Sequence, residues 1–257
     1  MLARLQLVLQ EENTEDKLNF RKSSALQGAM FEHIDSDYAS FLHQQNMHPY
    51  SQYFCFEGEQ PTWVISTTSD KAYEHMVLPL LSSSFQEFEL SHPQNSKIHI
   101  INKEVVSSSK EALLSRFRDE EAPKQIQIQF LTPTAFKQRG MYVILPDLRL
   151  LYQSLMMRFE ASDSKVVMFD EETLEQLVEY SYISFHRLRS VSFPLQGKSI
   201  PGFVGQLTIR FKGPETLARY ARMLFEFGEY SGVGIKTGMG MGAIKILKEN
   251  TNGKRTV

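Results

Sequence analysis

Histidine is the side chain of this sequence best suited to acid–base chemistry at neutral pH. Its ordinary pKa of about 6.5 keeps both forms of the imidazole populated, so that one histidine can accept a proton while another donates one. Two of the seven histidines, His43 and His48, lie close together in the stretch LHQQNMHPY. Residue type alone leaves open which of the seven is functional, since a lone histidine near a helix end is more often a surface residue.

Metal-dependent chemistry finds no support in the residue pattern. The chain has one cysteine, Cys55, and no His, Cys or carboxylate cluster with metal-ligand spacing. We therefore expect neither a metal nor another cofactor. A chain with one cysteine cannot form an internal disulfide. The absence of disulfides is typical of proteins of the reducing cytoplasm.

A glycine-rich segment, GVGIKTGMGMG, is the second feature with a chemical meaning. Five glycines surround Lys236 in it, namely Gly232, Gly234, Gly238, Gly240 and Gly242. Glycine lets another backbone approach closely, and exposed N–H groups beside a lysine can hold an anion. A helix is predicted before the segment and a strand after it, whereas nucleotide-binding glycine motifs lead from a strand into a helix. The order argues against a dinucleotide or nucleoside triphosphate site.

The elements that must position these residues fall into two similar halves. The first half begins with the alternating strand LARLQLVLQ and a helix from about Ser24, and a second helix has Asp35 as its predicted N-cap. It continues with a hairpin (FCFEG and PTWVISTT), a helix (DKAYEHMVLPLLSSS) and a strand (KIHIINKEVV). The predicted order is β-α-β-β-α-β.

The second half repeats this order. QIQIQF alternates cleanly, and a helix with Pro146 in its first turn follows (PDLRLLYQSLMMRF). A strand pair (YISFHRLRSVSF and FVGQLTIRFKG), a helix (PETLARYARMLFEFGEYSG) and a closing strand (AIKILK) complete it. The fold class predicted is α+β, with two tandem ferredoxin-like (RRM-like) domains over residues 1–122 and 123–257 and a linker near DEEAPK.

Composition and charge narrow the function classes. The chain is 42% hydrophobic and 23% charged, as in ordinary globular proteins, and no apolar run reaches the roughly 18–20 residues of a membrane helix. We read the alternating N-terminus as a strand and not as a signal peptide. Residues 1–125 carry 11 Lys and Arg against 18 Asp and Glu, and residues 126–257 carry 17 against 12. The basic second half is compatible with an anionic ligand.

Three stretches together resemble a known family. They are the glycine-rich segment, LTPTAFKQRGMYVILPD (Leu131 to Asp147) and LQGAMFEHIDSDYASFLHQQNMHPY (Leu26 to Tyr50). In a double ferredoxin-like chain they resemble the CRISPR precursor-RNA (repeat-cleaving) endoribonucleases of the RAMP superfamily, which work alongside a type III-like effector complex.

The resemblance implies metal-independent cleavage of CRISPR repeat RNA, which generates guide RNAs. The ribose 2′-hydroxyl attacks the adjacent phosphate and leaves a 2′,3′-cyclic phosphate and a 5′-hydroxyl. His43 matches the catalytic histidine of the family, and His48 lies where some members carry a second histidine or a lysine. Phe31 stands where some members have a tyrosine, so the resemblance leaves the general acid unidentified.

RNA binding is expected mainly in the basic half. The residues expected to contact RNA are Lys137, Arg139, Arg187, Arg189, Lys236 and the five glycines, whose backbone would form a surface for an RNA strand. We expect CRISPR repeat RNA as the partner, transient contact with a type III effector complex, no membrane, and either a monomer or a homodimer.

Two other functions stay open at this stage. The first is a non-catalytic RNA-binding subunit of an effector complex, built on the same double fold and the same glycine-rich segment. The second is a small-molecule enzyme or regulator, because ferredoxin-like domains host many activities.

Overall fold

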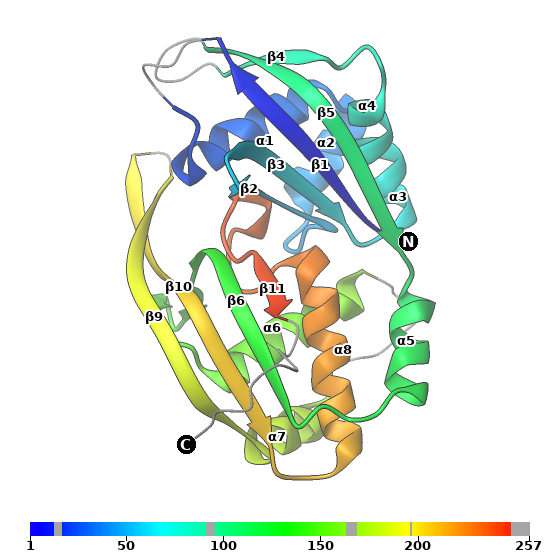
Figure 1. The fold of residues 1–257 in the computed structure, drawn as a ribbon, viewed down its shortest axis with the longest axis vertical. Helices are drawn as coiled ribbons and strands as arrows, with labels where there is room; N and C mark the ends of the chain where they lie inside the picture. The colour runs from blue at the N-terminus through cyan, green and yellow to red at the C-terminus, as the bar shows by residue number, and fades with distance from the viewer. Residues whose placement is uncertain (13–16, 91–95, 163–168, 196, 248–257) are drawn as a thin grey trace.

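The computed structural model describes residues 1–12, 17–90, 96–162, 169–195 and 197–247. The described chain forms two main antiparallel sheets, one above the other in Figure 1 and each packed on helices, and a small two-stranded sheet. No helix in these ranges is long and apolar enough to cross a lipid bilayer.

The first half contains a five-stranded sheet. Its elements in chain order are β1 (Leu2–Glu11), η1 (Phe20–Lys22), α1 (Ser23–Glu32), α2 (Ser36–Gln44), β2 (Tyr50–Glu57), β3 (Gln60–Thr67), α3 (Asp70–Ala72), the π-helical η2 (Tyr73–Val77), α4 (Leu78–Leu81), β4 (Glu87–Leu90), β5 (Ser96–Ser108) and α5 (Lys110–Asp119). The strand order is β2-β3-β1-β5-β4. Without the short edge strand β4, this is the ferredoxin-like order.

The second half contains a four-stranded sheet and a small hairpin. Its elements are β6 (Gln125–Thr134), β7 (Phe136–Gln138), β8 (Met141–Val143), α6 (Leu148–Ala161), α7 (Glu171–Glu179), β9 (Ser181–Leu195), β10 (Lys198–Phe211), α8 (Glu215–Ser231), η3 (Thr237–Met239) and β11 (Ile244–Leu247). The order β11-β6-β10-β9 is again ferredoxin-like. The predicted double ferredoxin-like fold class is confirmed.

Period-two patterns determine which face of each sheet packs on helices. In β1, Leu5, Leu7 and Leu9 are buried against α1 and α2. In β6, Ile126 and Ile128 are buried against α6 and α8, while the intervening glutamines point to the opposite face. Each half therefore has its own hydrophobic core.

Local sequence explains the helix boundaries around the candidate site. As predicted, the Asp35 side chain accepts a hydrogen bond from the Tyr38 backbone N–H and caps α2. The helix predicted over DKAYEHMVLPLLSSS is observed as one continuous helical run, in which the π-helical η2 separates α3 from α4. Pro79 lacks an N–H for the preceding turn, so the regular helical hydrogen bonding changes there.

The two halves meet along a polar and apolar seam. Arg4 donates to the backbone oxygen of Glu229 (2.7 Å), and Ser51 donates to that of Tyr230 (2.7 Å). A separate apolar cluster joins Leu2 and Leu113 to Phe227 of α8. These contacts place the α2–β2 loop beside the segment that follows α8.

Candidate active site

His48 lies in a pocket where the two halves meet. The pocket has a volume of 330 Å³ and lies between the α2–β2 loop, α6 and the glycine-rich segment. Its lining includes Asn46, His48, Arg158, Lys236 and Thr237. The structure therefore brings His48 together with two cations of the second half.

His43 lies in the last turn of α2 and is not among the residues that line this pocket, although its charge acts on His48. Its imidazole is exposed and stacks on Phe31, with ring centroids 5.1 Å apart and planes inclined by 19°. His48 lies 5.4 Å from the Tyr50 ring, which in turn lies 6.2 Å from Phe31. The two histidines thus flank one aromatic group.

The surroundings of His48 favour its neutral form. Burial lowers the pKa of His48 first, and the positive charges of Arg158, His43 and Lys236 lower it further. Its Nδ1 atom is buried and has no hydrogen-bond partner within the described chain. A neutral imidazole at pH 7 can accept a proton, as a general base must.

Arg158 is a residue of this site that our sequence reasoning did not single out. It projects from α6, and its Nη2 donates to the Gly234 oxygen (2.7 Å) while Nη1 donates to the Ser231 oxygen (3.4 Å). Burial lowers the pKa of Arg158 to about 10, so the guanidinium stays charged at neutral pH. An arginine among the mostly apolar residues of LYQSLMMRF was the available signal.

The phenol closest to the histidines is not available as an acid. Tyr50 is fully buried, and its hydroxyl accepts a hydrogen bond from Gln27 (2.7 Å). Burial raises the pKa of Tyr50, and Phe31 offers no hydroxyl. Within the described ranges, no group of three or more His, Cys, Asp or Glu side chains is arranged to hold a metal ion.

The glycine-rich segment is packed inside the seam. A Cβ at Gly238 would lie 2.9 Å from the Tyr50 hydroxyl, and a Cβ at Gly240 would lie 2.2 Å from Cβ of Ser23. The Gly238 oxygen also accepts a hydrogen bond from Gln52 (3.2 Å). Close packing against the first half thus accounts for these two glycines, and their contact with RNA stays a prediction.

Replacing Gly240 by alanine is expected to destabilise the protein. The residue has a left-handed φ of +109°, and the added Cβ would overlap Ser23. Backbone strain and overpacking together cost at least about 2 kcal/mol, so the melting temperature should fall by about 5 °C or more.

Gly28 is the matched control for this substitution. It lies inside α1, where an added Cβ would meet nothing within 4 Å. Gly28→Ala should therefore keep or raise the melting temperature. Unchanged stability with weaker RNA binding in Gly240→Ala would instead assign this glycine to the RNA surface.

Known proteins resemble this chain in sequence and in fold. Residues 128–244 match the family model described as CRISPR-associated endoribonuclease Cas6. The CRISPR-associated endoribonuclease Cas6 of Streptococcus thermophilus is 37% identical over 219 residues, which cover 85% of this chain and 88% of that protein. The chain belongs to the Cas6 family.

Other Cas6 proteins agree with this assignment. The Cas6 of Mycobacterium tuberculosis is 33% identical over 225 residues, covering 86% of this chain and 70% of its own length. A solved Cas6 product complex has the same fold, with a TM-score of 0.79 and 23% identity over 96% of this chain and 99% of that one. The Cas6 family model spans Arg158 and the glycine-rich segment but not the two histidines.

The remaining predicted RNA contacts of this Cas6 protein lie on two other surfaces. Lys137 and Arg139 are exposed on the β7–β8 hairpin. Arg187 and Arg189 are exposed on β9 and line a 450 Å³ hollow with Gln129. Of the predicted site residues, only His48, Gly234, Lys236 and Gly238 line the 330 Å³ pocket.

Proposed function

We propose that this Cas6 protein cleaves CRISPR repeat RNA within precursor transcripts and so generates guide RNAs. Membership of the endoribonuclease family makes it an RNA-cleaving enzyme. The observation that supports the chemistry is the pocket in which a neutral histidine faces Arg158 and Lys236. Cations beside a proton acceptor are what an attack on an RNA phosphate requires.

The residues of the candidate site have different roles in the proposed reaction. His48 takes the proton from the 2′-hydroxyl, because burial and nearby positive charge keep its imidazole neutral. The 2′-oxygen forms a bond to phosphorus as the bond to the 5′-oxygen breaks. His43 donates a proton to the leaving 5′-oxygen, and Arg158 and Lys236 stabilise the negative charge of the phosphorane. The products are a 2′,3′-cyclic phosphate and a 5′-hydroxyl.

A single atom of the substrate tests this mechanism. A repeat RNA with a 2′-deoxyribose immediately 5′ of the cleaved phosphate lacks the nucleophile. We expect this RNA to bind with unchanged affinity and to remain uncut in single-turnover reactions, while a 2′-deoxyribose one nucleotide further away leaves cleavage intact. Cleavage of the first RNA would show that a water molecule attacks, and the mechanism would be wrong.

We also propose a wider RNA-binding surface, a division into two domains and further partners for this protein. RNA contact by Lys137, Arg139, Arg187, Arg189, Lys236 and the five glycines follows from the basic second half, and a steep loss of affinity with salt would support it. Residues 1–122 and 123–257 would be the two domains. We further propose transient contact with a type III effector complex, a cytoplasmic location, and either a monomer or a homodimer.

A further inference from the structure

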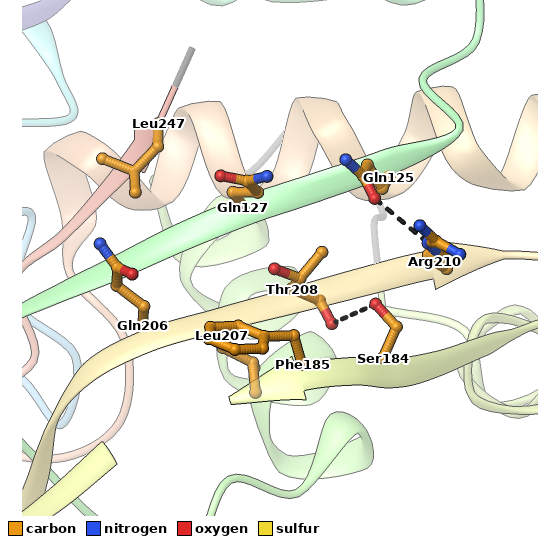
Figure 2. A pocket seen from close by; sticks show the side chains of 9 residues that line it. All are labelled: Gln125, Gln127, Ser184, Phe185, Gln206, Leu207, Thr208, Arg210 and Leu247. Carbon is orange, nitrogen blue, oxygen red and sulfur yellow. Dashed lines mark hydrogen bonds between the residues drawn. The ribbon is translucent and has the colours of Figure 1, made fainter. Parts of the chain in front are cut away.

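Glutamine side chains occupy both kinds of sheet face in this protein. Figure 2 shows three of them, Gln125, Gln127 and Gln206, around a 670 Å³ hollow on the open face of the second sheet. Gln52 of β2 lies instead on the helix-packed face of the first sheet, where it pairs with the buried Ile65 and is only 1% exposed. An amide in a core destabilises the fold unless its polar atoms are hydrogen-bonded, so its presence there calls for a reason.

Three hydrogen bonds satisfy the buried amide of Gln52. Its Nε2 donates to the backbone oxygens of Ser23 (2.8 Å) and Gly238 (3.2 Å), and its Oε1 accepts from the indole Nε1 of Trp63 (2.9 Å). A backbone oxygen can only accept and an indole N–H can only donate, so these partners fix the orientation of the amide. One side chain of β2 therefore joins β3, the start of α1 and the glycine-rich segment.

The partner in the glycine-rich segment lies beside a cation of the pocket. Gly238 belongs to the η3 turn, which begins directly after Lys236. Lys236 has a left-handed φ of +58°, which is unfavourable for a residue with a Cβ. Its backbone oxygen accepts hydrogen bonds from the N–H groups of Met239 (2.9 Å) and Met241 (3.2 Å). The turn thus holds Lys236 in a strained conformation, and Gln52 anchors the turn.

The same anchor is connected to His48 through the chain. Strand β2 begins at Tyr50, shortly after His48, and Gln52 belongs to its first turn of pleat. One side chain therefore ties the strand that follows His48 to the turn that follows Lys236, across the seam between the two halves. Both of these residues line the 330 Å³ pocket, whereas Gln52 does not. Since a displacement of about 1 Å can slow a reaction about 100-fold, such an anchor matters for catalysis.

We propose that Gln52 is a positioning residue that holds Lys236 in the pocket that contains His48. It acts through its hydrogen bond to Gly238, and Trp63 fixes the orientation of the amide. The proposal rests on the proposed function, because the positioned groups are those of the proposed reaction. It goes beyond that function by assigning the geometry of the pocket to a buried residue outside the pocket.

A double-mutant cycle of Gln52 and Lys236 tests the proposal. Gln52→Met removes the amide at similar volume, and displacement of Lys236 should slow single-turnover cleavage of repeat RNA by about 10–100-fold. In a Lys236→Ala background the same change should slow cleavage by less than about threefold, because the positioned group is already absent. Effects that multiply in the double variant would make Gln52 a structural residue only and would overturn the proposal.

Two further variants accompany the cycle. Gln52→Glu keeps the side-chain length and an oxygen for Trp63, so it should recover part of the rate, and it replaces Gln52→Met in the cycle if that variant does not fold. Tyr152→Phe is the matched control, since it removes a buried hydrogen bond to Ser181 (3.1 Å) in the second core. This control should lower the melting temperature and cleave at the wild-type rate.

Trp63 provides a spectroscopic readout of the anchor. It is the only tryptophan of the sequence and is fully buried, so the intrinsic fluorescence of the protein reports on its surroundings. Loss of the hydrogen bond to Gln52 should shift the emission of folded Gln52→Met to shorter wavelength, whereas the emission of Tyr152→Phe should equal that of the wild type. An unchanged emission in Gln52→Met would overturn the proposal.

Failure of this proposal and failure of the proposed function give different results. Cleavage at the wild-type rate by Gln52→Met would overturn the positioning proposal alone. A wild-type protein that binds repeat RNA without cutting it would overturn the proposed function. The cycle is then measured in the affinity for the same RNA, which Gln52→Met should weaken in the wild-type background but not in Lys236→Ala. Equal weakening in both backgrounds would overturn the positioning proposal as well.

Discussion

Replacing His48 by alanine is expected to slow single-turnover cleavage of repeat RNA by about 10²–10⁴-fold, the usual contribution of a positioned general acid or base. The imidazole faces the 330 Å³ pocket, and its buried Nδ1 has no partner in the described chain that the substitution would strand. The melting temperature should therefore change little. The measurement is the rate constant at saturating protein, with RNA affinity determined separately.

His43→Ala should fall in the same range, because the reaction needs an acid as well as a base. The control is His99→Ala, which removes a partly exposed histidine of β5 that is paired with Glu12 and Glu87. This variant should cleave at the wild-type rate. A His48→Ala enzyme that retains cleavage within about threefold of wild type would remove His48 from the chemistry.

Replacing Arg158 by methionine is the second substitution with a large expected effect. Loss of a preorganised donor near developing charge costs about 10²–10³-fold in rate. The Gly234 oxygen would also lose its 2.7 Å hydrogen bond, which lowers the free energy of unfolding by about 1–3 kcal/mol. Arg158→Lys keeps the charge and should recover part of the rate, but without the two-point contact to the loop.

The pH–rate profile distinguishes chemistry from mere loss of structure. Burial lowers the pKa of His48 most, and the positive charges of Arg158, His43 and Lys236 lower it further. Removal of the Arg158 charge should therefore raise the pKa of His48. Because the proposed mechanism uses the neutral imidazole of His48 as the base, the rising limb of the profile should move to higher pH in Arg158→Met. Arg149→Met changes a partly exposed residue of the same helix, paired with Glu171, and should leave both the rate and the profile unchanged. A slower Arg158→Met enzyme with an unshifted profile would make the residue structural only.

Alternation and capping made much of the fold predictable from the sequence. The period of two in β1 and β6 shows which face of each strand packs against the helices. Asp35 marks the start of α2, because its side-chain oxygen accepts a hydrogen bond from the first turn of the helix. The short strand β4 and the β7–β8 hairpin were not predicted, because segments of three or four residues carry too little periodicity. Helix α5, which precedes the predicted linker, was not predicted, because most of its residues are polar or charged and few of them are buried.

The candidate site was predictable only where local sequence carries the information. The family resemblance singled out the two histidines, and Lys236 was singled out by its place inside the glycine-rich segment. Arg158 was not, because its role depends on α6 lying beside the end of α8, which is a tertiary contact. The glycines were visible as a pattern, but the packing of Gly238 on Tyr50 and Gly240 on Ser23 joins positions far apart in the chain.

The most direct test of the central claim is the fate of 5′-labelled CRISPR repeat RNA incubated with the enzyme in EDTA. We predict a single cut by the wild type, a product with a 2′,3′-cyclic phosphate, and no cut by His43→Ala. Cleavage that requires a divalent cation, or a product with a free 3′-hydroxyl, would contradict the account. Binding without any cut by either protein would favour a non-catalytic RNA-binding role instead.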